Sequence, residues 1–121
     1  METPGTGVVL YKDPDVMVVV LQDGATATSN GVWVPIGFYG RQVDIHVQGI
    51  TTATVQLYSD STYSYTTNNT GTPPNATDVT QVGANITADA HVTLTGVGLW
   101  LKAKVSAYTS GTINVVAVCR R

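Results

Sequence analysis

Two histidines, eight carboxylates and one cysteine are the residues of this 121-residue chain that could carry catalysis or bind a metal. His46 and His91 lie far apart in the sequence, and neither has a second histidine three to five residues away, a spacing that zinc sites use. Asp44 precedes His46 by two residues, so both side chains share a face if the segment is a strand. The pattern predicts a solvent-facing histidine beside a carboxylate, and no metal site. A third ligand from a neighbouring strand is the alternative that would complete one.

A catalytic nucleophile needs a base within hydrogen-bonding reach and a third group that orients the base. The chain contains no Gly-x-Ser-x-Gly elbow and no phosphate-binding loop. Cys119 shares a face with Ile113, Val115 and Ala117, which predicts a small buried hydrophobic residue rather than a reactive thiol. A glycosidase pair of carboxylates from separate strands is the alternative that stays open. We expect the protein to be neither an enzyme nor a cofactor-binding protein.

Aromatic side chains offer a different kind of site, because they concentrate at contacts between subunits and at sugar-stacking platforms. Trp100 and Tyr108 alternate with an aliphatic row, so they project from the opposite face of their segment. Either a neighbouring loop or a second sheet covers them, or they form an exposed patch. The residues that we predict as candidates for an interface are Pro4, Trp33, Phe38, Tyr39, Tyr63, Tyr65, Trp100 and Tyr108.

The segments that must position these side chains show the two-residue period of half-buried strands. Residues 42–48 are apolar at odd positions and polar at even ones, and residues 53–58 repeat the pattern after a short connection. Residues 99–108 and 112–118 lie on either side of a Thr-Ser-Gly turn signal. We predict one β-hairpin from each of these two pairs of segments.

Other segments of the chain predict short strands as well. Residues 8–11 form a β-branched run that ends at Pro14, which stands between two aspartates and favours a turn. Residues 16–21 are apolar at every position, which is typical of a strand covered on both faces. No segment has helical periodicity with caps. We predict an all-β fold of about eight strands, an antiparallel β-sandwich of the jelly-roll or immunoglobulin-like type.

The domain organisation follows from these strands and the segments between them. We predict an N-terminal arm and first short strand over 1–15 and a single domain over 16–121. Within that domain, residues 60–78 form a long polar loop, and loops of this length are usually functional or disordered. The proline and glycines of residues 1–7 suit an arm that becomes ordered on binding.

Composition excludes several classes of function. Charged residues make up 12% of the chain and the net charge is -2, whereas 19 residues are threonine. The single cysteine excludes an intrachain disulfide, and the charge balance excludes a basic nucleic-acid binder and a disordered acidic tail. The chain shows neither a basic leader with an apolar core nor a run of about 18 apolar residues. We therefore expect synthesis in a cytoplasm, with no membrane and no nucleic acid as partner.

Residues 33–40 read Trp-Val-Pro-Ile-Gly-Phe-Tyr-Gly, and Val-Asp-Ile-His-Val-Gln-Gly and Ala-Thr-Val-Gln-Leu-Tyr-Ser-Asp follow at 43–49 and 53–60. Together with residues 101–115, this texture resembles small virion proteins of tailed bacteriophages, among them head decoration, or cement, proteins. The resemblance implies a β-sandwich without catalytic residues that docks where major capsid subunits meet. Its implied partners are the major capsid protein and further copies of itself, with a homotrimer preferred over a homodimer. Its implied location is the capsid surface, after synthesis in the host cytoplasm.

Two other functions fit the same sequence. In a carbohydrate-binding module, Trp33, Trp100 or Tyr63 would stack on sugar rings. A tail or head-completion component of a virion would differ from a decoration protein in its copy number per particle.

Overall fold

The computed structural model describes residues 5–60, 80–95, 97 and 100–121. Of the predicted interface residues, Pro4, Tyr63, Tyr65 and the side chain of Phe38 lie outside the described residues. Residues 61–78 of the predicted polar loop lie outside them as well.

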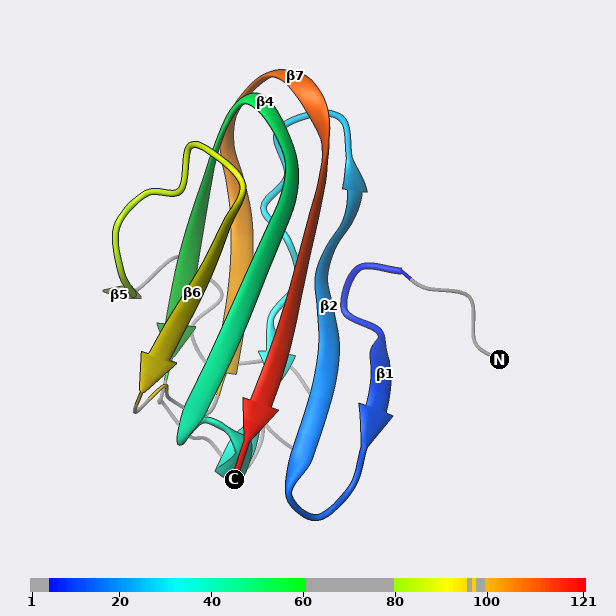
Figure 1. Cartoon of the computed structure of the whole chain (residues 1–121), viewed down its shortest axis with the longest axis vertical. Helices are drawn as coiled ribbons and strands as arrows, with labels where there is room; N and C mark the ends of the chain where they lie inside the picture. The colour runs from blue at the N-terminus through cyan, green and yellow to red at the C-terminus, as the bar shows by residue number, and fades with distance from the viewer. Residues whose placement is uncertain (1–4, 61–79, 96, 98–99) are drawn as a thin grey trace, which may run out of the picture.

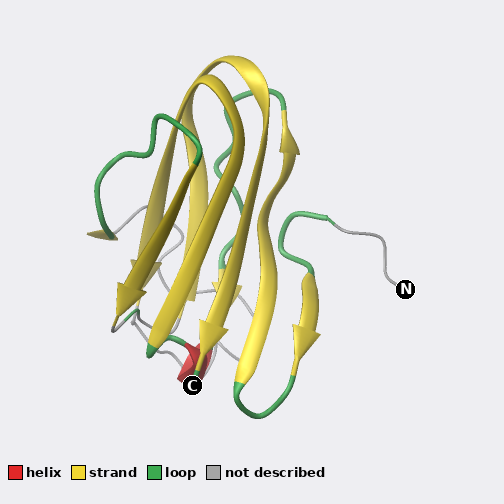
Figure 2. Ribbon diagram, in the orientation of Figure 1, coloured by secondary structure: helices red, strands yellow, loops and turns green. Residues whose placement is uncertain are grey.

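Seven strands and one short 3-10 helix make up the regular structure of the described residues (Figure 1 and Figure 2). The strands are β1 (Val9–Lys12), β2 (Val16–Ala25), β3 (Val34–Pro35), β4 (Gln42–Asp60), β5 (Thr80–Gln81), β6 (Ala90–Thr95) and β7 (Trp100–Arg120), and the helix is η1 (Gly37–Tyr39). All pairs between these strands are antiparallel, so the predicted all-β antiparallel class is confirmed. The predicted count of about eight strands is not confirmed, since the described residues form seven.

All seven strands belong to one hydrogen-bonded sheet, in the order β1-β2-β7-β4-β5, with β3 paired to β7 and β6 paired to β4. β4 and β7 run antiparallel along their whole length, from Gln42 opposite Arg120 to Asp60 opposite Trp100. Both strands bend over at the same level, so the sheet folds back on itself into two layers (Figure 1). The jelly-roll or immunoglobulin-like type stays a prediction.

Each layer contains half of β4 and half of β7. The first half of β4 and the second half of β7 lie with β1, β2 and β6 in one layer, which we call the front layer because it faces the viewer in Figure 1. The other halves lie with β3 and β5 in the back layer. Two strands therefore connect the layers directly, without a loop between them.

Both predicted hairpins are wrong. Residues 42–60 and 100–120 each form one continuous strand, and the two halves of each strand lie in different layers. The alternation correctly identified most inward side chains, because that pattern is the same in a hairpin and in a bent strand. It is wrong for Ala107, which belongs to the predicted inward row but is exposed near the bend. Alternation cannot distinguish two cases: a turn that brings the chain back beside the same strand, and a bend that carries the strand into a second layer.

Two glycines make the bend possible. Gly49 and Gly111 have φ angles of 86° and 124°, in the region that L side chains rarely adopt. A Cβ atom on Gly49 would lie 1.8 Å from the carbonyl oxygen of Thr112, and one on Gly111 would lie 2.4 Å from the carbonyl oxygen of Gly49. The two backbones approach so closely that only glycine fits at either position.

The core between the two layers is almost entirely aliphatic. Its buried residues alternate along the strands and include Met17, Val19, Leu21, Val34, Ile36, Val43, Ile45, Val47, Val55, Leu57, Leu101, Ala103, Val105, Ile113, Val115, Ala117 and Cys119. The predicted burial of Cys119 is confirmed, and desolvation raises the pKa of its thiol to about 12.

Strand β2 departs from its predicted environment. Its inward residues Met17, Val19 and Leu21 are buried, but Val16 and Val18 on the outer side remain partly exposed. The prediction that both faces of this strand are covered is therefore wrong for these two residues, whereas Val20 on the same side is buried.

We expect Gly49→Ala to lower the free energy of unfolding by about 3 kcal/mol or more, because the new Cβ meets a backbone oxygen held in the β4–β7 ladder. Gly37→Ala is the matched control: its φ is 52°, but nothing lies within 4 Å of the Cβ position. The control should cost about 1 kcal/mol from backbone conformation alone. Urea unfolding monitored by tryptophan fluorescence measures both changes, and equal losses would contradict the role of the close approach.

The Cys119 thiol should resist a thiol reagent such as DTNB in the folded protein at mildly alkaline pH. Its raised pKa keeps the thiol protonated, and the core excludes the reagent. The same thiol should react fully after unfolding in guanidinium. Rapid labelling of the folded protein would show that the second half of β7 does not pack as described.

Candidate interaction surface

Strand β1 is an edge strand that exposes apolar side chains. Among the described strands it pairs with β2 alone. Val9, Leu10 and Tyr11 have exposed fractions of 37%, 46% and 54%. Soluble proteins commonly protect a sheet edge with charges, prolines or bulges, because its free N–H and C=O groups can pair with another chain. β1 has two of these features, a register shift between Val9 and Tyr11 and a lysine at its end, but its three apolar residues remain exposed, which favours a contact with a partner.

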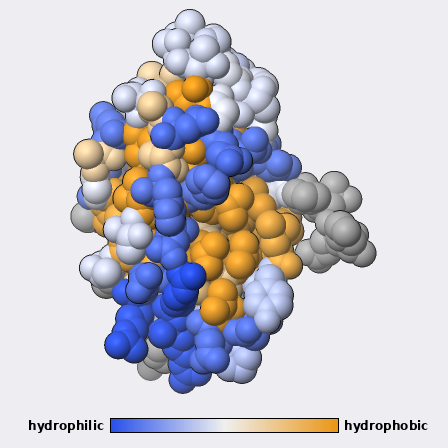
Figure 3. Space-filling model, viewed as in Figure 1, coloured by the Kyte–Doolittle hydropathy of each residue, from blue (hydrophilic) through white to orange (hydrophobic). Residues whose placement is uncertain are grey.

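The apolar surface continues from β1 across β2 and the second half of β7. Val18 lies opposite Val118, and Tyr11 lies opposite Val18 on the other side. The outward residues of these strands are only partly buried, and Figure 3 shows hydrophobic residues gathered on this side of the molecule. We call the following residues the apolar face: Leu10, Tyr11, Val16, Val18, Val116 and Val118. Val9 lies opposite the buried Val19, so it belongs to the edge strand but not to this face.

The turn after β1 holds this edge strand in place. Asp13 Oδ1 accepts hydrogen bonds from the backbone N–H groups of Asp15 (2.8 Å) and Val16 (2.7 Å), and Oδ2 accepts one from the Tyr11 hydroxyl (2.6 Å). The Tyr39 hydroxyl donates to the carbonyl oxygen of Asp13 at 2.6 Å. The hydrogen bond from Tyr11, with those from the backbone, lowers the pKa of Asp13, and the same contact raises the pKa of Tyr11. The predicted turn around Pro14 is confirmed.

The β4 and β6 part of the front layer is polar. Thr93 donates a hydrogen bond of 2.9 Å to Asp44, and Arg120 forms an ion pair with the same carboxylate. The hydrogen bond from Thr93, followed by the contacts with Arg120, lowers the pKa of Asp44 against the opposing effect of desolvation. This polar strip borders the apolar face (Figure 3).

The two histidines meet on the polar strip. His46 lies directly opposite His91 in the β4–β6 ladder, with ring centroids 6.0 Å apart in an edge-to-face arrangement. Nothing in their sequence spacing indicated this proximity, because it depends on the register of β4 against β6. No group of three or more His, Cys, Asp or Glu side chains within the described ranges could hold a metal ion.

The predicted aromatic candidates whose side chains the structure describes make contacts within the body of the protein. Trp100 is only 3% exposed, so it does not form the exposed patch considered for it; its strand pairs with Pro35 on one side and Asp60 on the other. The Trp33 ring carries the Lys102 ammonium 4.9 Å from its centroid, a cation–π contact. Tyr108 donates a 2.6 Å hydrogen bond to the carbonyl oxygen of Gly111, which supports the bend.

The structure differs from the predicted interface residues in two ways. The ring of Trp33 has a lysine over it and Trp100 is buried, so neither offers a free platform for a sugar ring. The exposed residues of β1 were not among the predicted candidates. Their signal was present in the sequence, since a short apolar strand that ends at a proline turn is typical of a sheet edge.

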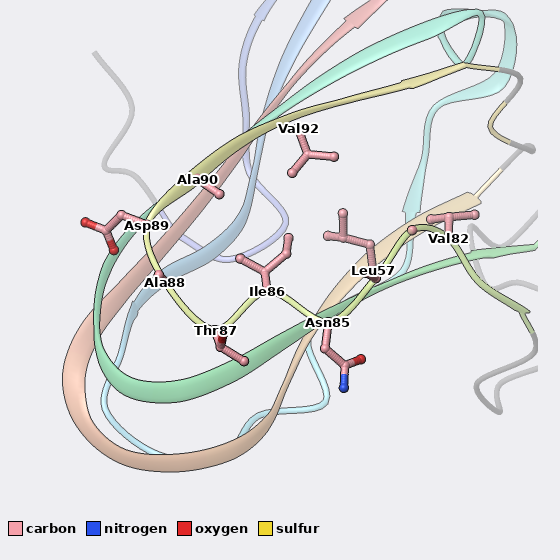
Figure 4. A pocket seen from close by; sticks show the side chains of 11 residues that line it. Leu57, Val82, Asn85, Ile86, Thr87, Ala88, Asp89, Ala90 and Val92 are labelled. Atoms are coloured by element: carbon pink, nitrogen blue, oxygen red, sulfur yellow. The ribbon is translucent and has the colours of Figure 1, made fainter.

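A groove of about 390 Å³ lies beneath the segment that joins β5 to β6, and it is also lined by residues of β4 and β6 (Figure 4). Ile86 of this segment is bridged to Val55, and Leu57, Val82 and Ile86 give the groove an apolar lining. Asn85 and Asp89 point away from it, so no ionisable side chain labelled in Figure 4 reaches into the groove. This arrangement offers packing space rather than a reacting group.

Comparison with known protein families finds no family that matches the chain, and comparison with curated protein sequences finds no match either. Among solved structures, the chain is similar to the SPBc2 prophage-derived protein YomS, with a TM-score of 0.61 and 17% sequence identity. The likeness covers 94% of this chain and 100% of that one, and it shows a shared fold. Within the described residues, no helix has the length and apolar character needed to cross a membrane.

Asp13→Ala is expected to destabilise the protein at neutral pH, because it removes the acceptor of three hydrogen bonds. The pKa of Asp13 in the folded state lies below its ordinary value of 3.8, so its contribution is present above that pH and is lost as the pH falls through the folded-state pKa. The difference in Tm from the wild type should therefore shrink below about pH 4.

Calorimetry across the acid range tests this expectation. Asp15→Ala removes the neighbouring carboxylate but leaves the acceptor side chain of Asp13 in place, so it should follow the pH profile of the wild type. A Tm deficit of Asp13→Ala that stays constant with pH would contradict a role for the ionised carboxylate.

Proposed function

We propose that the protein is a structural component of a tailed-phage virion that associates with itself and binds the outside of an assembled head shell, which it stabilises as a decoration protein does. The observation that carries this proposal is the apolar face, where an exposed edge strand is continuous with partly buried valines. A contiguous apolar surface on a soluble domain marks a site of contact with another molecule.

Two comparisons support a phage virion as the setting. Residues 33–40, 43–49, 53–60 and 101–115 resemble small virion proteins of tailed phages. The solved structure whose fold is similar to this chain is itself described as prophage-derived. A β-sandwich body of the kind that decoration proteins have agrees with a sheet that folds into two layers.

The composition of the chain also suits a protein that is covered by neighbours. Threonine supplies 19 of 121 residues, while charged residues supply 12%. Threonine keeps a strand propensity and carries only a hydroxyl to desolvate, whereas a buried charge without a partner is costly. The strands can therefore present polar side chains at a contact without burying charges.

Binding to the assembled shell alone would stabilise that shell by mass action. The gain is RT ln(1 + [L]/Kd), about 2.7 kcal/mol per site at a free concentration of 100 Kd. Because a shell repeats the same site many times, a small protein with no catalytic function would raise its resistance to heat or chaotropes. The partner in this contact is the major capsid protein.

We assign the apolar face to the contact between copies of the chain, with a homotrimer preferred over a homodimer. The free main-chain groups of β1 can pair with a strand of the neighbouring copy. Leu10 and Tyr11, both more than two-fifths exposed, supply side-chain anchors for that contact. The remaining surface of each copy is then available to the shell.

Leu10→Glu is expected to weaken self-association, because the contact would bury a carboxylate without a partner. We expect a loss of about 2 kcal/mol per contact, which raises the dissociation constant roughly 30-fold. Size-exclusion chromatography with light scattering, over a concentration series, measures the change. Thr95→Glu places the same charge on an exposed residue of β6, away from the apolar face, and should leave the oligomer intact.

Sedimentation with expanded head shells of the encoding phage tests the second half of the proposal. Wild-type protein should saturate the shells and raise their melting temperature. A wild-type chain that is monomeric and does not bind shells would overturn the proposal. A copy number per virion far below that of the major capsid protein would instead indicate a tail or head-completion component.

A further inference from the structure

The histidine pair on the polar strip lies on one of the most regular parts of the sheet. Residues 42–47 of β4 pair with residues 90–95 of β6 through six consecutive pairs without a shift in register. β4 is also paired with β7 on its other side, so the strand that carries His46 is held from both edges. The backbone therefore fixes the relative positions of His46 and His91.

The geometry of a directly opposed pair suits chelation. Side chains opposite each other in an antiparallel ladder have Cβ atoms about 5 Å apart, which lets two imidazole rings converge on one ion. Here the ring centroids are 6.0 Å apart and the rings are inclined at 61°. Both histidines are exposed, so their rings can rotate toward a common ion without disturbing the core.

The charges around the pair favour a cation. Asp44 precedes His46 by two residues on the outer face of β4, and Asp89 lies in the bend just before β6, two residues ahead of His91. Arg120 is paired with Asp44, while Asp89 accepts a 2.8 Å hydrogen bond from the backbone N–H of Ile50. The net charge of these two carboxylates and one guanidinium is negative, which favours a cation near the histidine pair.

We propose that His46 and His91 together chelate one divalent transition-metal ion of the Zn²⁺, Ni²⁺ or Cu²⁺ class. Imidazole nitrogen is a preferred ligand for these ions, whereas Mg²⁺ and Ca²⁺ select oxygen ligands. Since the described residues hold no group of three ligating side chains, water completes the coordination. The site lies on β4 and β6, apart from the apolar face, and does not depend on the proposed function.

Zinc titration of the untagged chain tests the proposal. Calorimetry with ZnCl₂ should give one ion per chain, and Zn²⁺ should raise the Tm because it binds the folded ladder that brings the ligands together. His46→Gln and His91→Gln should each weaken binding on the order of tenfold to a hundredfold, because each removes the second half of a chelate. The double variant His46→Gln/His91→Gln should lose little more affinity for Zn²⁺ than either single variant.

The swap variant His91→Thr/Thr95→His is the matched control. It keeps the number of histidines and the exposed side of β6, but it moves one imidazole from the position opposite His46 to the position opposite Gln42. Four residues along a strand span about 13 Å, too far for two imidazoles to share one ion, so this variant should bind Zn²⁺ as weakly as the single variants. Wild-type affinity in this control would overturn chelation by the pair. So would a His46→Gln/His91→Gln variant whose loss of binding free energy equals the sum of the losses in the two single variants.

A second measurement does not depend on any variant. In the wild-type protein, the imidazole NMR signals of His46 and His91 should shift together and saturate at one Zn²⁺ per chain. Shifts with different midpoints, or shifts of only one ring, would show that the two histidines do not share an ion.

Discussion

The close approach of two backbones at Gly49 and Gly111 is the constraint on which the rest of the structure depends. A side chain at either position would collide with a carbonyl oxygen of the opposite strand, so both strands can bend together only where both carry glycine. The shared bend keeps β4 and β7 hydrogen-bonded from one layer into the other and superimposes their aliphatic rows. The core thus forms between two parts of one sheet, and its closure does not rely on a loop at the bend.

Closure of the core by two bent strands determines which strand edges remain unpaired at the surface. The two central strands are paired on both sides, so the free edges pass to short outer strands, and β1 is one of them. Asp13 ties the end of β1 to β2 through hydrogen bonds that close the turn, which holds an apolar edge in an ordered conformation. An ordered apolar edge loses less conformational entropy on binding than a flexible one, and this favours the contact assigned to it.

The front layer separates two kinds of surface by strand. Valines on β2 and β7 continue the apolar edge, whereas the carboxylate, threonine and histidine side chains occupy β4 and β6 (Figure 3). A contact between copies through the first surface leaves the second accessible. The proposed self-association and the proposed metal chelation therefore involve different strands of the same layer, and a change in one does not require a change in the other.

The sequence alone determined the fold class and the inward side chains, because a strand with one buried face shows its alternation locally: Val43, Ile45, Val47, Ile113, Val115 and Cys119 are all buried as their pattern predicts. It also marked the turn at Pro14. Only the tertiary structure decided that Gly49 and Gly111 bend strands rather than end them, since that depends on the carbonyl groups that pack against them. The same holds for the burial of Trp100, the exposure of Leu10 and the meeting of His46 with His91, which follow from layer, edge and register. Those three properties arise from pairings between distant segments, and a two-residue period carries no information about them.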